Sequence, residues 1–396
     1  MTLPIPYGHH WLDEDDIAEV LRALRSDWIT QGPRIDEFER RMAAACGARF
    51  GVAFSSGTTA LHAACAAAGV QAGDEVVTSP LTFVATANAA VTQGAKPVFA
   101  DIDPASLNID PGQIRRRLTP RTKAILPVHF AGLPAEMEAI SRIARERDLC
   151  VIEDACHALG AEWLDSQGTW QKIGNCSHSD MAVLSFHPVK HITTGEGGMI
   201  LTNREDLLSS LRAFRHHGLR RPEGKLAETE PWRHEMQEIG CNGRLTDFQC
   251  ALGLSQMEKL GQFLEKRRRI AALYAQAWAG LDLTPQSFSG KKFRHAWHLY
   301  VVQLGVKTGS ADRRAVFEAL REMGIGANVH YLPVHLHPFY QQTFSYRAGD
   351  YPIAEKYYER ALTLPLFPKM LDEQVREVIQ SVGRILEQEG APHAAR

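Results

Sequence analysis

The chain has 396 residues, of which 44% are apolar and 23% charged, and its formal net charge at pH 7 is −2. This composition is typical of a globular protein with room for one large domain and a smaller one, and gives no support to nucleic acid or an anionic membrane as the main partner. No apolar run approaches the length of a membrane-spanning helix, and the seven cysteines are scattered without a C-x-x-C pair. We therefore expect a cytoplasmic protein without a disulfide framework.

Hydrophobic periodicity predicts alternating helices and strands through the first half of the chain. Asp13 is expected to cap a first helix, and a second is expected from about 35 to 45. Strands are then predicted at 51–54, 75–78, 97–100, 124–128 and 150–153, with helices at 61–68, 85–91, 111–118 and 136–147. Further strands at 181–186 and 199–202 complete a mostly parallel sheet covered on both faces.

The pattern changes after a long helix predicted from 248 to about 278. The other elements expected here are a helix at 207–214, a mobile polar loop at 220–233, strands at 297–304 and 327–331, and helices at 313–323, 353–361 and 372–388. We expect a large domain from 1 to 255 and a smaller one from 256 to 396, with about the first 30 residues packing against the smaller domain.

A lysine lies at the end of one predicted buried strand. Lys190 follows Ser185 by five residues and precedes a hydroxyl pair and a glycine-rich turn. An ammonium in such a place must be paired or lose its charge, and one solution is a covalent Schiff base to a carbonyl compound. The alternative is an ordinary surface lysine after a strand.

The stretch Ser55–Thr59 joins a strand to a helix and favours phosphate binding. The first amides of a helix are free donors with partial positive charge, and Gly57 allows close approach. A plain Ser/Thr helix cap is the alternative. Nothing in the chain matches the Walker or dinucleotide-binding glycine patterns.

Two further motifs end at the same expected edge of the sheet. The strand 150–153 delivers Asp154, and a carboxylate there pairs well with a protonated pyridine nitrogen, although it also suits a helix cap. Phe83 follows the strand 75–78 and offers a flat face to a ring, or else lies in the core. His330, His335 and His337 lack the carboxylates or cysteines of a metal site, so no metal is expected.

In chain order, these features give a phosphate cradle, a flat aromatic, an acid at a strand end and a lysine after a later strand. Together they predict a site for pyridoxal 5′-phosphate (PLP). The chain also resembles the DegT/DnrJ/EryC1/StrS family of sugar aminotransferases over nearly its whole length, most specifically at 82–88, 153–160, 185–198 and 242–253. The resemblance implies an α/β fold of the aspartate-aminotransferase type (PLP fold type I), with a mostly parallel mixed sheet and a smaller C-terminal α+β domain.

The resemblance also implies roles for particular residues. Lys190 would bind the cofactor covalently, Asp154 would pair with its ring nitrogen, and His157 would lie near its phenolic oxygen. The other cofactor contacts implied are Ser56, Gly57, Thr58, Phe83, Ser185 and, from the second subunit of a homodimer with shared active sites, Asn242. The residues expected to contact a nucleotide sugar are Tyr7, Asp27, Trp28, Ile29, Thr30, Asn328, Val329, His330 and Tyr331.

Within the family, the chain is most similar to the transaminases of pseudaminic acid biosynthesis. The partners that this implies are L-glutamate as amino donor and a UDP-linked 4-keto-6-deoxy-N-acetylhexosamine as acceptor, giving UDP-4-amino-4,6-dideoxy-N-acetyl-β-L-altrosamine. Three alternatives stay open: an aminotransferase for another UDP- or dTDP-sugar with a C3 or C4 keto group, a PLP-dependent sugar dehydratase, and a non-enzymatic protein that binds the cofactor or a nucleotide sugar. Lys190 argues against the dehydratase, because its relatives carry histidine at that position.

Overall fold

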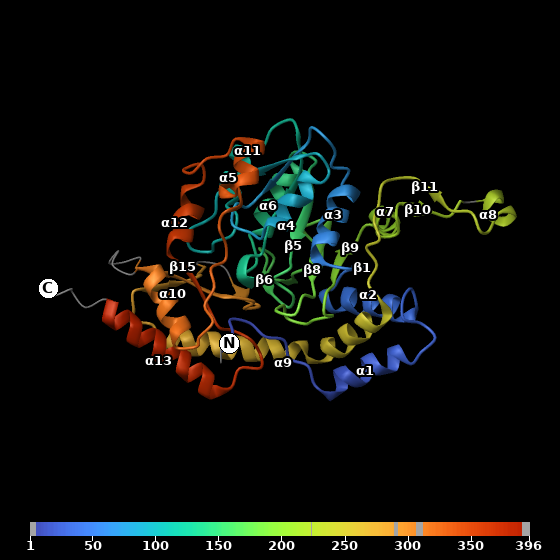
Figure 1. Cartoon of the computed structure of the whole chain (residues 1–396). Coiled ribbons are helices and arrows are strands. Elements are labelled where there is room, and N and C mark those ends of the chain that lie inside the picture. The colour runs from blue at the N-terminus through green and yellow to red at the C-terminus, as the bar shows by residue number, and fades with distance from the viewer. Residues whose placement is uncertain (1–4, 223, 289–291, 306–311, 390–396) are drawn as a thin grey trace.

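A seven-stranded sheet lies at the centre of the computed structural model, which describes residues 5–222, 224–288, 292–305 and 312–389 (Figure 1). Its strand order is β1-β9-β8-β5-β4-β2-β3. The strands are β1 (Phe50–Phe54), β2 (Glu75–Thr78), β3 (Lys96–Phe99), β4 (Thr122–Leu126), β5 (Cys150–Asp154), β8 (Met181–Ser185) and β9 (Gly198–Thr202). The strands from β8 to β3 run parallel, whereas β9 is antiparallel to both its neighbours. The expected mostly parallel mixed sheet is confirmed.

Helices cover both faces of this sheet. Because successive strand residues point to opposite faces, Val151 of β5 belongs to one core and Ile152 to the other. The helices that pack on the first core include α2 (Pro33–Cys46), α5 (Pro111–Arg117), α6 (Met137–Arg145) and the start of α9 (Asp247–Ala277). The helices on the second core are α3 (Gly57–Ala67), α4 (Val84–Val91) and α7 (Glu205–Arg215), and alanines on α3 and α4 allow close packing there.

A second, antiparallel sheet has its own core. Its strands are β12 (Leu283–Pro285), β14 (Tyr300–Leu304) and β15 (Ala361–Leu364). The helices α10 (Arg313–Glu322) and α13 (Asp372–Glu389), the second half of α9 and Ile5 contribute to that core. The predicted division between residues 255 and 256 falls inside α9, a helix that supplies both cores, and it stays a prediction.

The remaining elements lie at the edges. They are α1 (Glu14–Leu24), α8 (Lys225–Thr229), α11 (Pro338–Phe344), α12 (Pro352–Arg360), η1 (Phe130–Gly132), η2 (Val334–Leu336), β6 (Glu162–Leu164), β7 (Trp170–Lys172), β10 (Leu219–Arg220), β11 (Glu235–Met236) and β13 (Phe293–Arg294). Asp13 caps α1 as expected, through its bond to the backbone N–H of Asp16. Within the described ranges, no helix is long and apolar enough to cross a membrane, and all seven cysteines carry free thiols.

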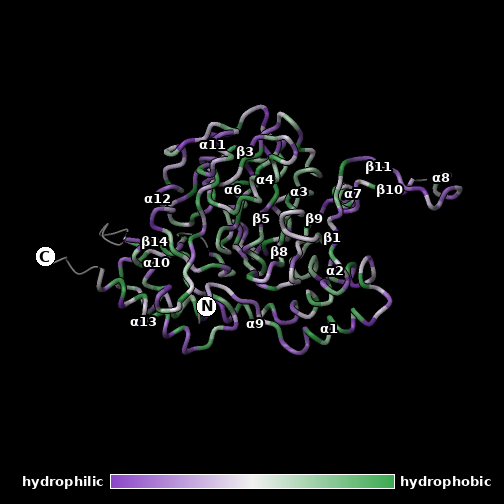
Figure 2. The backbone as a smooth tube through the Cα atoms, in the orientation of Figure 1, coloured by the Kyte–Doolittle hydropathy of each residue, from purple (hydrophilic) through white to green (hydrophobic). Residues whose placement is uncertain are grey.

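Two expected elements differ from the structure. The stretch 220–233, expected as a loop, belongs to an arm in which β10 pairs with β11 and α8 forms the tip; the arm projects from the body and is largely hydrophilic (Figures 1 and 2). The predicted strand at 327–331 is wrong, because this segment makes only one bridge, from Asn328 to Thr363. Val329 and Tyr331 of this segment line the cavity described next rather than pairing in a ladder.

Candidate active site

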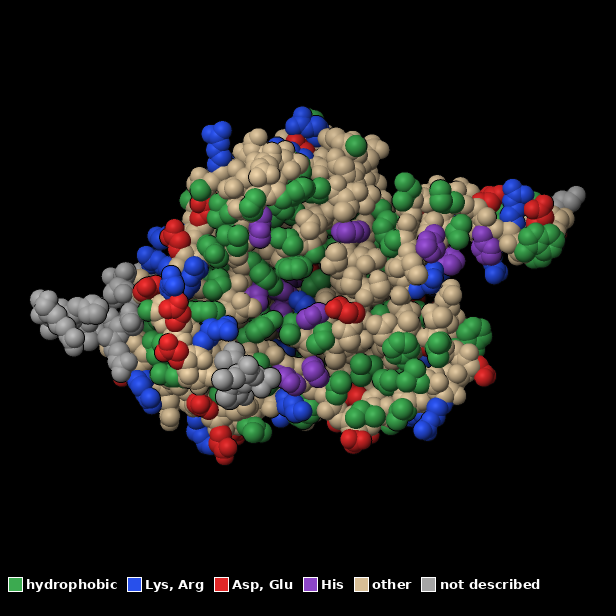
Figure 3. Space-filling model, in the orientation of Figure 1, with side chains coloured by type: hydrophobic (Ala, Val, Ile, Leu, Met, Phe, Trp, Pro, Cys, Tyr) green, Lys and Arg blue, Asp and Glu red, His purple; other side chains and the backbone are tan. Residues whose placement is uncertain are grey.

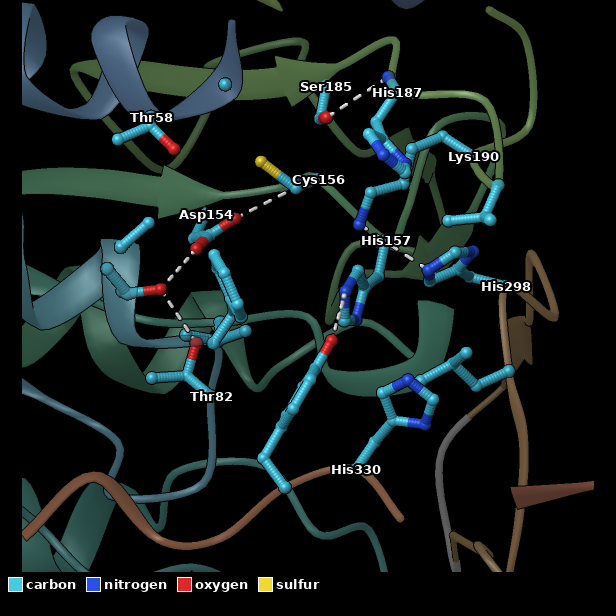
Figure 4. Close-up of a pocket in the computed structure, with 18 of the residues that line it drawn as sticks. Thr58, Thr82, Asp154, Cys156, His157, Ser185, His187, Lys190, His298 and His330 are labelled. Carbon is cyan, nitrogen blue, oxygen red and sulfur yellow. Dashed lines mark hydrogen bonds between the residues drawn. The ribbon is translucent and has the colours of Figure 1, made fainter. Parts of the chain in front are cut away.

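A cavity of about 600 Å³ opens at the carboxyl ends of β5 and β8. Side chains from both ends of the sequence reach it, from Tyr7 to Tyr331. Histidines gather around this central hollow in the space-filling view, and the close-up shows Asp154, His157, Lys190 and His298 directed toward it (Figures 3 and 4). Such an edge, where parallel strands end, is where open α/β sheets bind ligands.

The Asp154 carboxylate is held in one orientation at the end of β5. Its Oδ2 accepts a hydrogen bond from the hydroxyl of Thr86 at 2.7 Å, and its Oδ1 accepts one from the backbone N–H of Cys156 at 3.2 Å. The hydroxyls of Thr82 and Thr86 are 2.7 Å apart, so Thr82 can donate to Thr86 while Thr86 donates to the acid. Only 6% of Asp154 is exposed. An oriented, buried carboxylate of this kind suits a cationic partner.

The start of α3 forms another wall of the cavity. Ser56 caps the helix by accepting a hydrogen bond from the N–H of Thr59 at 3.1 Å. A Cβ added at Gly57 would lie 3.0 Å from Cβ of Ser185 and 3.4 Å from Sγ of Cys156. Glycine therefore keeps this corner open beside helix amides that lack intrahelical partners. The corner fits a phosphate group.

Lys190 lies in the turn after β8, and its backbone N–H donates to the carbonyl of His187 at 2.8 Å. Its amine is 3.5 Å from Nε2 of His298. Burial lowers the pKa of Lys190 below its ordinary value, and the neighbouring Cys156 and Asp154 offset this only in part. An amine with a lowered pKa is a better nucleophile and proton acceptor at neutral pH.

Three buried histidines form the wall nearest Lys190. The hydroxyl of Tyr331 lies 3.3 Å from Nε2 of His157, whose Nδ1 has no partner among the described residues. The rings of His157 and His298 lie 4.4 Å apart between centroids. Burial lowers the pKa of both, and it lowers the pKa of His330 to about 3, so all three are neutral at pH 7.

Most of the predicted site residues line this one cavity. They are Tyr7, Ser56, Gly57, Thr58, Phe83, Asp154, His157, Ser185, Lys190, Asn328, Val329, His330 and Tyr331. The predicted residues that do not line it are Asp27, Trp28, Ile29, Thr30 and Asn242. The segment 27–30 lies beside the loop that contains Asn242, because Thr30 bridges to Thr246 and the N–H of Asp247 donates to the carbonyl of Ile29 at 3.0 Å.

Thr86, Cys156 and His298 are among the cavity residues that were not assigned a role from the sequence. Thr86 lies in the first turn of α4 and Thr82 lies before that helix begins, so the contact between their hydroxyls depends on the turn between them and not on helical spacing. Cys156 stands between Asp154 and His157 and carried no separate signal. His298 could not be found from the sequence, because it reaches the site only through the packing of the second sheet against the first. Among the described residues, no group of three or more His, Cys, Asp or Glu side chains is arranged to hold a metal ion.

Comparisons with known proteins agree with this geometry. The DegT/DnrJ/EryC1/StrS aminotransferase family profile matches residues 10–383. The spore coat polysaccharide biosynthesis protein SpsC of Bacillus subtilis is 40% identical, over 96% of this chain and 97% of SpsC. PseC of Helicobacter pylori, an aminotransferase of pseudaminic acid biosynthesis, superposes with a TM-score of 0.88 at 32% identity, over 97% of this chain and 99% of PseC.

Spr1654 of Streptococcus pneumoniae has been solved in forms that bear directly on the cofactor. Its PLP form superposes with a TM-score of 0.88 at 27% identity, over 97% of this chain and 99% of Spr1654. Its form with pyridoxamine 5′-phosphate (PMP), the aminated state of the same cofactor, superposes with a TM-score of 0.89 at 28% identity. A site whose residues suit a phosphate, a ring cation and a reactive aldehyde therefore lies in a fold that carries this cofactor.

Proposed function

Because the chain belongs to the DegT/DnrJ/EryC1/StrS aminotransferase family, whose cofactor is PLP, we propose that it transfers an amino group from L-glutamate to a nucleotide sugar. The acceptor is the 4-keto group of a UDP-linked 4-keto-6-deoxy-N-acetylhexosamine. The product is then UDP-4-amino-4,6-dideoxy-N-acetyl-β-L-altrosamine, an intermediate of pseudaminic acid biosynthesis. The observation that carries this proposal is the similarity to PseC along 97% of the chain.

The cavity residues fit PLP in charge and shape. Asp154 would hold the ring nitrogen, the start of α3 together with Ser185 would hold the phosphate, and Phe83 would cover a face of the ring. The partnerless Nδ1 of buried His157 is a free polar position on the same cavity, within the part of the chain that the structure describes. When bound, the cofactor supplies a ring that withdraws electrons from the carbon carrying the amine.

The protein supplies the proton transfers and the orientation. Asp154 would stabilise a proton on a pyridine nitrogen, because the bonds from Thr86 and Cys156 keep its carboxylate in a fixed orientation. Burial lowers the pKa of Lys190, so the free amine takes up a proton from substrate carbon and returns it. Burial lowers the pKa values of His157, His298 and His330, which makes these histidines weak proton acceptors. The role of the base therefore falls to Lys190.

A panel assay tests the proposal. The purified, PLP-loaded protein is first mixed with L-glutamate alone, and loss of the cofactor's visible absorbance with release of 2-oxoglutarate indicates the first half-reaction. It is then offered UDP- and dTDP-linked 4-keto and 3-keto sugars. The proposal predicts fastest amination of the UDP-linked 4-keto-6-deoxy-N-acetyl sugar. Absence of that product, with the first half-reaction intact, would refute the proposed acceptor.

A second candidate is an aminotransferase for a different nucleotide sugar. It is favoured by one observation: SpsC, a spore coat polysaccharide biosynthesis protein, is 40% identical, whereas PseC is 32% identical. The same panel distinguishes the two, because a preference for a dTDP-sugar or for a 3-keto group would select this second function.

The active form that we propose is a cytoplasmic homodimer with shared active sites. Three features support the dimer: the apolar residues Ile17, Leu21 and Leu24 of α1 are exposed, Trp28 is 55% exposed, and the projecting arm carries Ile239 at 86% exposure. Large apolar side chains exposed in this number are typical of an interface. The predicted site residues 27–30 and Asn242, which lie off the chain's own cavity, would then serve the cavity of the second copy.

Subunit mixing tests the shared site. Lys190→Ala and Asn242→Ala proteins are each expected to be impaired, but a mixed dimer contains one site with both native residues. Activity that rises on mixing therefore supports sharing. If mixing gives no more than the summed activities, although exchange of subunits is verified by mass, the shared site is wrong.

A further inference from the structure

The Lys190 amine has one polar neighbour that the reaction outlined above does not use. Nε2 of His298 lies 3.5 Å from Nζ of Lys190 (Figure 4). We propose that His298 is a positioning residue for Lys190: its imidazole holds the amine at the cavity wall through Nε2. This inference rests on the part of the proposed function that makes Lys190 the cofactor-binding lysine, and not on the identity of the sugar.

The backbone around His298 is fixed firmly enough to position a ring. The guanidinium of Arg267, which is 1% exposed, donates to the carbonyls of Trp297, His298 and Leu366 at 3.0–3.1 Å. On the other side, the N–H of Leu299 donates to the carbonyl of Ala131 at 3.2 Å. His298 therefore stands between the second core and the loop beside the large sheet, and only 4% of this residue is exposed.

The surroundings of His298 keep its ring neutral. The titratable and charged groups that face it are Lys190, His157, His191 and Arg267, all of them basic. Burial lowers the pKa of His298, and the positive charge of Lys190 lowers it further. Around Lys190, the carboxylate of Asp154 and the thiol of Cys156 act in the opposite sense to Arg267. A neutral imidazole is therefore the form that meets the amine.

A neutral imidazole can hold this amine in both of its protonation states. With the ring proton on Nδ1, Nε2 accepts a hydrogen bond from the ammonium; with the proton on Nε2, the ring donates to the free amine. The Nδ1 of His298 has no partner in the described structure, so no other bond fixes the tautomer. A lysine that must gain and lose a proton during turnover keeps its contact throughout.

The test compares two amides of different reach. His298→Gln places an amide near the position of Nε2, whereas the side chain of His298→Asn is one methylene shorter. The readout is the rate at which the cofactor-free full-length chain captures PLP covalently, followed by absorbance as a function of pH. In this capture, the Lys190 amine adds to the aldehyde carbon and water leaves as the carbon–nitrogen double bond forms.

The Asn variant loses the bond that stabilises the ammonium. The midpoint of its curve of capture rate against pH is therefore expected to fall by about one pH unit, and the maximal capture rate at high pH by about tenfold. The Gln variant is expected to stay near wild type in both. His335→Gln is the matched control, because His335 is equally buried but pairs with Glu355 away from the amine; it should change neither value.

Two outcomes overturn the inference: an Asn variant that matches wild type, or Asn and Gln variants that shift equally. Lys190→Ala separates this failure from failure of the premise. If Lys190→Ala still captures the cofactor as wild type does, Lys190 is not the lysine that binds it, and the premise is wrong. If Lys190→Ala captures none, the premise holds, and the comparison of the Asn and Gln variants tests only the role of His298.

Discussion

The two sides of the cavity differ in how fully their polar groups are bonded. On the side of the large sheet, Asp154 accepts bonds from Thr86 and from the backbone of Cys156, and Ser56 caps α3. On the wall nearest Lys190, which we call the histidine side, His157 and His298 each leave a buried ring nitrogen without a partner among the described residues. Both sides are buried, so burial alone does not explain the difference.

The difference indicates two kinds of task. A carboxylate fixed by several donors is preorganised, and it stabilises a developing charge without moving. A neutral imidazole with a free nitrogen can change its hydrogen-bond role as a ligand or a neighbouring amine changes protonation. We infer that the residues on the side of the large sheet hold the cofactor in place. The histidines change their hydrogen bonds as the groups beside them gain and lose protons.

The largest expected effect comes from the fixed side. Asp154→Asn keeps the shape of the carboxylate but removes its charge, so a ring proton loses its stabilising partner. We expect the rate of the glutamate half-reaction to fall about a thousandfold, measured by rapid-mixing absorbance. A decrease in this rate of less than about threefold would show that Asp154 is not needed to stabilise the proton on the ring nitrogen.

Histidines that are buried and neutral predict acid sensitivity of the fold. The pKa values of His295 and His330 are both lowered to about 3 from 6.5 by burial. The unfolded chain therefore binds protons more readily, so this stability is complete above 6.5 and is lost as the pH falls. Each should cost roughly 2 kcal/mol of unfolding free energy at pH 5.

Denaturant unfolding at pH 8 and pH 5 measures this loss directly. In His295, the backbone N–H of Trp297 donates to Nδ1 at 2.8 Å, while Nε2 lies 3.0 Å from Oε1 of Gln286. The neutral ring satisfies both contacts, and a proton on Nδ1 would break one. An unfolding free energy that does not change with pH over this range would contradict the conclusion that His295 and His330 are buried in the neutral form.

A smaller effect is expected at the phosphate corner. Gly57→Ala would place its Cβ 3.0 Å from Cβ of Ser185 and so narrow the corner. We expect the dissociation constant for PLP to rise about tenfold, measured by fluorescence titration. The matched control is Gly383→Ala on α13, where an added Cβ meets nothing within 4 Å; it should leave PLP binding unchanged. Equal dissociation constants for PLP in the two variants would show that Gly57 does not contribute to the phosphate site.

The smallest effect is expected from removing the hydroxyl that orients the carboxylate of Asp154. Thr86→Val removes the 2.7 Å hydroxyl donor while keeping the shape of the side chain. We expect kcat to fall about fivefold with little change in KM for the sugar, because the acid keeps its charge and its bond to Cys156. Thr82→Val lies one bond further from the acid and should have a weaker effect. A stronger effect for Thr82→Val would refute this order.

Local patterns predicted much of the fold and the sheet side of the cavity. Alternating strands and helices gave the parallel sheet, and the ends of its strands placed Asp154 and Lys190 at one cavity. The antiparallel position of β9, the hairpin in the arm and the approach of His298 were not predicted. Each depends on contacts between residues distant in the chain, which periodicity does not encode. The 327–331 segment was misassigned because its apolar residues serve a cavity rather than a ladder.

The most direct test of the account locates the cofactor on the chain. The PLP-loaded protein is reduced with borohydride, which makes the carbon–nitrogen bond permanent, and is then digested and mapped by mass spectrometry. We predict the added mass on the peptide that contains Lys190 and on no other lysine. An adduct on a different lysine, or no adduct in a protein that holds the cofactor, would contradict the site described here.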